Sequence, residues 1–167
     1  MRRYLVVFIA LSVALVAARC GRTSTKADAP FSPDLLKEQV GFSLTFPGYV
    51  PAGVSFAKYA VQPDVGPLGP SVSLLYSGPS GFLRVEESKS PRSLMRNKTA
   101  GIQTAIVNGQ QIQLEVASAD INSGVPSRVT AVFKSGDLFV FIDSANLPAD
   151  EIVKVISSFP SPLSVEQ

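Results

Sequence analysis

Histidine and tryptophan are absent from this 167-residue sequence, and cysteine occurs once, at position 20. Without histidine, the chain lacks the usual base of catalytic triads and a common zinc ligand. A single cysteine cannot form an internal disulfide, so a hydrophobic core alone has to stabilise the fold. A hydrophobic content of 46% is compatible with such a core. We therefore expect no enzyme activity, no metal and no cofactor.

Charge is also scarce and nearly balanced. The chain carries 15 Lys+Arg and 13 Asp+Glu. Arg2, Arg3 and Arg19 precede the cleavage site expected below, which leaves 12 basic and 13 acidic side chains in the remainder. Because no basic stripe with interleaved aromatic residues is present, we expect no nucleic-acid partner.

The N-terminus has the pattern of an export signal. Arg2 and Arg3 are followed by an uncharged apolar run over residues 4–18, which matches the charged start and short apolar core of a signal peptide. As a helix this run would span about 22 Å, against roughly 30 Å of bilayer hydrocarbon, so an uncleaved membrane anchor is less favoured. We expect residues 1–19 to be a signal peptide and the folded domain to lie outside the cytoplasm.

Two processing routes are open at the end of this signal. Residues 16–18 (VAA) with Cys20-Gly21 resemble a bacterial lipobox, in which the cysteine becomes the acylated N-terminus. Arg19 departs from that pattern, since a small residue normally precedes the cysteine. Ordinary cleavage after residue 18 would instead give a secreted protein. The only cysteine lies directly before a small, polar tether, residues 20–32, and this placement favours lipidation of Cys20 and a membrane anchor.

Hydrophobic periodicity predicts one α+β domain over residues 33–162, followed by a tail over residues 163–167. The segment SPDLLKEQV is typical of a short N-terminal helix, with Leu35, Leu36 and Val40 toward the core. Alternation with period two predicts strands in FSLTF, VSFAKYAV, SVSLLYS, FLRVEES, IQTAIV, QQIQLEV, SRVTAVF and LFVFID. We expect a single antiparallel sheet of about seven strands in a hairpin meander.

A C-terminal helix is predicted to pack on this sheet. In LPADEIVKVISSF the apolar residues recur at i, i+3, i+4 and i+7, which places four of them on one stripe: Ile152, Val155, Ile156 and Phe159. Pro160 ends the helix. The stripe is expected to share a buried face with Phe133, Leu138, Val140 and Ile142.

Turn sequences indicate which strands form hairpins. GPSG joins SVSLLYS to FLRVEES. Asn108-Gly109 favours a tight type I′ turn, although its simple register places Ile106 opposite Gln111, so a bulge or a longer loop is the alternative.

The last hairpin has a register that can be checked against its own sequence. A two-residue turn at Ser135-Gly136 pairs Val132 with Phe139. The opposite face is then wholly apolar: Val129, Ala131, Phe133, Leu138, Val140 and Ile142. A one-residue slip would mix the two faces. Apolar residues also occupy the first face, so we expect these strands in the middle of the sheet.

The order of strands, turns and helices resembles a bacterial family of unknown function. This family occurs in extracytoplasmic parts of Gram-positive lipoproteins, sporulation-linked proteins and anti-sigma-factor-like membrane proteins. The resemblance covers roughly residues 42–159 and rests on PGYVPAG, VSLLYS, GIQTAIVNGQQIQL and FVFIDSANLPADEIVKVISSF. It implies no reaction and no functional residue. A weaker resemblance, through VGFSLTFP and the terminal helix, is to exported domains similar to the photosystem-associated PsbP proteins.

Two patterns look catalytic and are better explained by chance. SFAK (Ser55 to Lys58) and KSG (Lys134 to Gly136) match two boxes of penicillin-binding enzymes. Ser55 and Lys58 fall in a strand, where a spacing of three predicts opposite faces, while that chemistry needs a helix. Glu86 and Glu87 likewise point to opposite faces, and we expect both to be solvated charges and not a glycosidase pair.

Two features indicate binding. Lys89, Arg92, Arg96 and Lys98 lie within ten residues; they are either an exposed loop or a contact for anionic lipid or wall polymer. The last two strands are apolar on both faces, which indicates either a sheet covered on both sides or an apolar pocket. We expect a non-catalytic, membrane-tethered envelope domain that binds a protein or senses a condition. The alternative is a carrier of lipid or another apolar ligand.

Overall fold

The computed structural model describes residues 31–62, 69–91, 100–120, 122, 124–160 and 162–163. Two helices, α1 (Pro33–Val40) and α2 (Ala149–Ser157), accompany eight strands. The strands are β1 Ser55–Gln62, β2 Ser71–Gly78, β3 Gly81–Ser88, β4 Gly101–Val107, β5 Gln110–Ala117, β6 Arg128–Ser135, β7 Leu138–Ala145 and β8 Pro162–Leu163.

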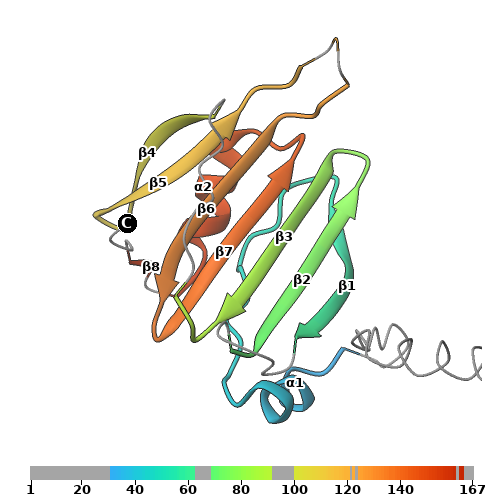
Figure 1. The fold of residues 1–167 in the computed structure, drawn as a ribbon, viewed down its shortest axis with the longest axis vertical. Helices are drawn as coiled ribbons and strands as arrows, with labels where there is room; N and C mark the ends of the chain where they lie inside the picture. The colour runs from blue at the N-terminus through green and yellow to red at the C-terminus, as the bar shows by residue number, and fades with distance from the viewer. Residues whose placement is uncertain are drawn as a thin grey trace, which may run out of the picture.

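All pairings within this single sheet are antiparallel, in the order β1-β2-β3-β7-β6-β5-β4. The short β8 pairs with the end of β6. Two runs of hairpin-linked strands, β1 to β3 and β4 to β7, therefore meet where β3 pairs with β7 (Figure 1). The predicted α+β class and antiparallel sheet are confirmed, and β6 and β7 are central as expected.

One face of the sheet is packed by α2, which lies behind the sheet in Figure 1. We call this side the packed face. The helical stripe is confirmed for Ile152, Val155 and Ile156, which are fully buried. Phe159 lies beyond the end of α2 but is also buried, and its ring is 5.2 Å from that of Phe133. The strand residues predicted to share this core are also buried: Phe133, Leu138, Val140 and Ile142. The β4–β5 hairpin curves toward the helix, since α2 also contacts β4.

The predicted first strand, FSLTF, is wrong. Residues 42–50 form no strand, and they cross the packed face with Phe42 buried and Leu44 and Phe46 packed against the core. The alternation correctly identified the apolar side chains, but an extended segment can cover a sheet without pairing with it. In α1, Leu36 and Val40 are buried as predicted, whereas Leu35 is 52% exposed.

The hairpin turns fit the sequence to different degrees. Asn108 and Gly109 both have positive φ, 49° and 79°, and the simple register holds without a bulge, as a type I′ turn requires. The last hairpin turns at Gly136-Asp137, so Val132 pairs with Phe141 and the predicted pairing of Val132 with Phe139 is wrong. Because the error is two residues, the predicted faces remain correct.

Candidate binding face of the sheet

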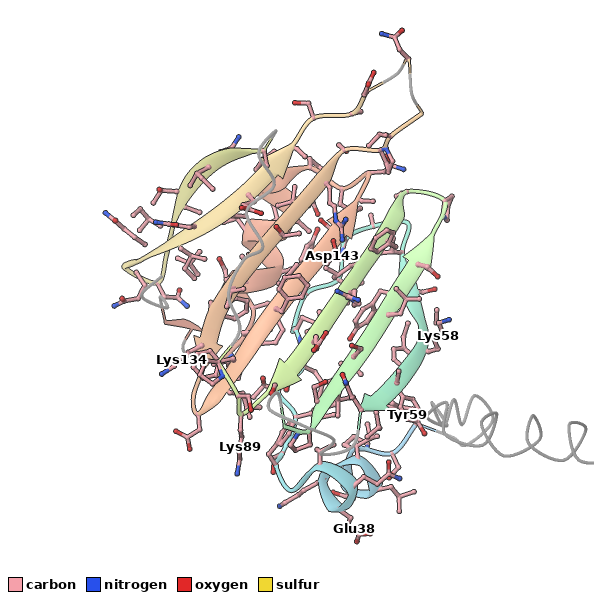
Figure 2. All side chains as sticks on the ribbon, in the orientation of Figure 1. Glu38, Lys58, Tyr59, Lys89, Lys134 and Asp143 are labelled. Carbon is pink, nitrogen blue, oxygen red and sulfur yellow. The ribbon has the colours of Figure 1, made fainter. Side chains whose placement is uncertain are left out.

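The second face of the sheet, which we call the open face, is directed toward the viewer in Figures 1 and 2. One row of side chains crosses it through all seven long strands. From β1 to β4 the registers align Lys58, Leu75, Arg84, Asp143, Thr130, Glu115 and Ile102. No described helix packs on this face, so its polar and aromatic side chains are the best candidates for contact with a partner.

Asp143 lies in the middle of this row and contacts two arginines, Arg84 in the row and Arg128 beside it. Its carboxylate accepts two hydrogen bonds from Arg128, 2.6 Å from Nε to Oδ1 and 2.7 Å from a terminal nitrogen to Oδ2. A terminal nitrogen of Arg84 lies 3.6 Å from Oδ2. The hydrogen bonds to Asp143 raise the pKa of Arg128, against a lowering by burial. One carboxylate thus holds the Arg128 guanidinium through two hydrogen bonds and forms a longer ion pair with Arg84.

The two arginines keep substantial contact with solvent. The Asp143 side chain is 5% exposed, whereas those of Arg84 and Arg128 are 40% and 56% exposed. Arg84 also lies over the ring of Phe141, with Cζ 5.4 Å from the ring centre, and its buried Nε has no hydrogen-bond partner among the described residues. The cluster therefore has one net positive charge beside an aromatic surface.

A second cation–aromatic pair lies farther along the same face. Lys134 Nζ is 4.8 Å from the ring centre of Phe139. Phe139 is also the cross-strand partner of Ser88, and Lys89 follows at the end of β3. Figure 2 shows Lys134 and Lys89 toward the end of the sheet that lies away from Asp143.

The four predicted surface cations are only partly described. Lys89 is exposed, and its Nζ lies 3.5 Å from the carbonyl oxygen of Gly41. Arg92, Arg96 and Lys98 lie outside the described residues, as does Cys20. Their roles stay predictions. The expected boundary between the signal peptide and the tether falls outside the described part of the chain as well, whereas the expected end of the tether, at Ser32, directly precedes α1.

A buried acid on the packed face was missed. Glu87 is fully buried, so the prediction of a solvated charge at this position is wrong. Its Oε2 accepts a hydrogen bond of 2.8 Å from the backbone N–H of Thr45. Burial raises the pKa of Glu87 to about 7, against the effect of the Thr45 hydrogen bonds. Its alternation with Leu83 and Val85 was the signal that could have found it, because side chains two apart share a face.

The prediction that Ser55 and Lys58 lie on opposite faces of a strand is wrong. A β-bulge between Phe56 and Lys58 shifts the register of β1, so Ser55 and Lys58 both pair with open-face residues of β2. They share a face after all. Lys134, however, is on β6, four strand positions from β1, which is about 19 Å at 4.8 Å per strand. Ser55 and the KSG lysine are too far apart for one reaction centre.

The described residues contain neither a candidate metal site nor a membrane-spanning helix. Within the described ranges, no three Asp, Glu, Cys or His side chains are grouped so that they could hold a metal ion. No helix in the same ranges is long and apolar enough to cross a membrane.

No protein-family model, no curated protein and no solved structure matches this chain. The open face must therefore be interpreted from its own chemistry.

Proposed function

We propose that this protein is a non-catalytic, membrane-tethered extracytoplasmic domain that binds another envelope protein through its open face. The observation that carries the proposal is the Arg84–Asp143–Arg128 cluster beside Phe141. Arginine and aromatic side chains are the residues most enriched in protein interfaces, because they combine apolar area with directed hydrogen bonds.

The arrangement on the open face is suited to binding. Asp143 holds the Arg128 guanidinium through two hydrogen bonds, so less entropy of that side chain is lost when a partner arrives. The partner's carboxylates or backbone carbonyls would accept from the donors that Asp143 leaves free. Polar open-face residues around the cluster would form the rim of the interface.

The carrier of a lipid or other apolar ligand is the alternative function. Such a ligand needs apolar space, and the packed face offers it only if α2 moves away. Ile152, Val155 and Ile156 fill that region and are each fully buried. The packing therefore favours the protein-binding hypothesis.

Site-specific photocrosslinking in intact cells tests the binding surface. A photoreactive residue at Leu75 or Thr130, both half-buried on the open face, should capture one envelope protein. The same residue at Ser157, exposed on α2, is the matched control. Arg84→Ala with Arg128→Ala should remove the crosslink, and the identified protein should bind the purified domain. Equal capture from Ser157, or none from the open face, would contradict the proposal.

Native mass spectrometry of protein purified from membranes tests the alternative. The domain is expected to be free of bound ligand, apart from acyl chains attached at Cys20. A lipid that copurifies at a ratio of one to one would favour the carrier and argue against the protein-binding hypothesis.

Membrane attachment through Cys20 is tested separately. Cys20→Ser removes the residue that would carry the acyl chains, and stable anchoring needs two or more such chains. The domain should then appear in the soluble fraction or remain as unprocessed precursor. Arg19→Gly should speed processing, since it restores a small residue before the cysteine. An intact mass equal to that of an unmodified chain beginning at Arg19 would contradict lipidation and show that the protein is secreted.

A further inference from the structure

The two edge strands of the sheet differ in their protection against pairing with another strand. The β1 edge has the bulge between Phe56 and Lys58 and an exposed lysine, two devices that block edge-to-edge association. β4, Gly101–Val107, has the sequence GIQTAIV, which contains no charge and no proline, and its pairing with β5 has no bulge. Among the described residues, no strand pairs with the outer edge of β4, and its sequence does not block a further strand.

The backbone phase of β4 follows from its turn. Val107 and Gln110 flank the two-residue turn and pair with each other, and residues in that position exchange both backbone hydrogen bonds. Alternate residues then direct their N–H and C=O groups away from β5. In β4 these outward residues are Ile102, Thr104 and Ile106.

The same three residues also share one face of the sheet. Their partners in β5 are Glu115, Gln113 and Gln111, on the open-face side. Ile102 is 51% exposed and Ile106 is 63% exposed, which are large values for isoleucine. Figure 1 shows β4 at the outer edge of the sheet, with no other described strand beyond it.

These residues are arranged symmetrically about Thr104. If a second copy of β4 pairs antiparallel with the first and Thr104 faces its own counterpart, Ile102 of each copy faces Ile106 of the other. All the outward backbone groups are then paired, and each exposed isoleucine gains an isoleucine neighbour across the new ladder. The edge is self-complementary, as a two-fold interface requires.

We propose that the protein forms a homodimer by antiparallel pairing of β4 with β4 of a second copy, centred on Thr104. The charge pattern favours this occupant, because the neutral strand brings no like charges together. The two-fold axis runs perpendicular to the sheet, so the open faces of both copies lie on the same side. The dimer thus has one continuous sheet with two copies of the arginine cluster facing the same way.

Charge-swap variants test the dimer and its register together, with the full chain in detergent micelles and analytical ultracentrifugation as the measurement. The wild type should show a concentration-dependent monomer–dimer equilibrium. Ile102→Lys with Ile106→Lys places lysine opposite lysine, and the dissociation constant should rise at least tenfold. Ile102→Lys with Ile106→Glu places opposite charges across the two-fold axis, and dimerisation should return.

The control changes the other edge. Ala60→Lys with Gln62→Lys, both at exposed positions of β1, should leave the dissociation constant unchanged, and thermal melting shows that each variant is folded. A wild type that stays monomeric at millimolar concentration overturns the proposal. So does a Lys/Glu variant as weak as the Lys/Lys variant. If the chain is monomeric and the β4 variants lose binding to a different protein, then the β4 edge is the binding site of that protein. This result would also overturn the dimer proposal.

Discussion

The two faces of the sheet bury acidic groups in opposite ways. On the open face, Asp143 is nearly inaccessible but accepts two hydrogen bonds from Arg128, which replace hydrogen bonds it would make with water, and Arg84 forms a longer ion pair with it. On the packed face, Glu87 accepts one backbone hydrogen bond from Thr45, and its Oε1 has no partner in the described part of the chain. The first arrangement holds a charge in place, and the second favours the neutral acid.

Because of this difference, substitutions on the packed face should affect stability and substitutions on the open face should affect binding. The packed face is continuous with the core, so a change there acts on the whole fold. On the open face Asp143, Glu115 and Val132 are buried, but the arginines and aromatic rings around them are partly exposed, so their contacts with one another are screened by water. We therefore expect large effects on stability from the first and small ones from the second.

The largest effect is expected for Val140→Asp. Val140 is fully buried, and an unpaired carboxylate there should cost at least about 4 kcal/mol, enough to unfold a domain of ordinary stability. Phe141→Asp, one residue on and directed to the open face, is the matched control and should cost only about 1–2 kcal/mol. Urea denaturation followed by circular dichroism distinguishes them. Equal losses would show that the two faces are equally buried.

Glu87 predicts a pH dependence of the free energy of unfolding. Because its pKa is raised from 4.5 to about 7 in the folded state, the native protein binds the proton more tightly than the unfolded chain. Stability from this group is then full below pH 4.5 and falls as the pH rises to about 7, by about 3 kcal/mol. Above that range it is constant.

Glu87→Gln isolates this contribution, because the amide keeps the shape and cannot ionise. Relative to the wild type, the variant should gain stability steadily between pH 4.5 and 7.5. Chemical denaturation at half-unit intervals measures the difference. Curves that stay parallel over the whole range would mean that Glu87 has an ordinary pKa in the folded protein.

Asp143→Ala should have an intermediate effect of about 1–2 kcal/mol. The change removes a buried acceptor and leaves two arginines that solvent can hydrate, since both are partly exposed. Asp143→Asn keeps one acceptor and should lose less. Thermal melting compares the two variants; a loss as large as that of Val140→Asp would make the cluster a part of the core.

The smallest effect on stability is expected for Arg84→Ala, within about 0.5 kcal/mol. Its side chain is 40% exposed and its salt-bridge distance is 3.6 Å. The same variant should weaken capture of the envelope partner at least tenfold if the open face is the binding surface. Thermal melting measures the change in stability and crosslinking measures the change in capture, both on one preparation. A loss of stability without a loss of capture would show that Arg84 supports the fold and not the binding surface.

The sequence predicted the elements better than it predicted their partners. Periodicity identified both helices and the seven long strands, because burial on one face imposes a repeat of 3.6 or two residues. The same test could not fix the β6–β7 register, since a shift of two residues leaves every side chain on its own face. The turn begins at Gly136, whose φ of 60° places it first in the turn and leaves Ser135 in the strand.

The candidate site was hardly accessible from the sequence. Arg84, Arg128 and Asp143 are separated by up to 59 positions and come together only because β7 lies between β3 and β6. Arg128 reaches Asp143 diagonally, since its direct partner in β7 is Ala145. The predicted surface cations, in contrast, could be recognised from the sequence because they lie within ten residues of one another: Lys89, Arg92, Arg96 and Lys98.

By itself, the sequence determined most of the segments that would be helix or strand, the apolar side of most of them, and where the tightest turn would form. These depend on residues within a few positions of one another. The tertiary structure alone decided that residues 42–50 would cover the sheet and not join it, and that β4 would become an edge. It also decided that one acid would meet two arginines while Glu87 would be buried with a backbone N–H. The reason is physical: a strand's pattern specifies its faces, but its neighbours depend on contacts between distant parts of the chain.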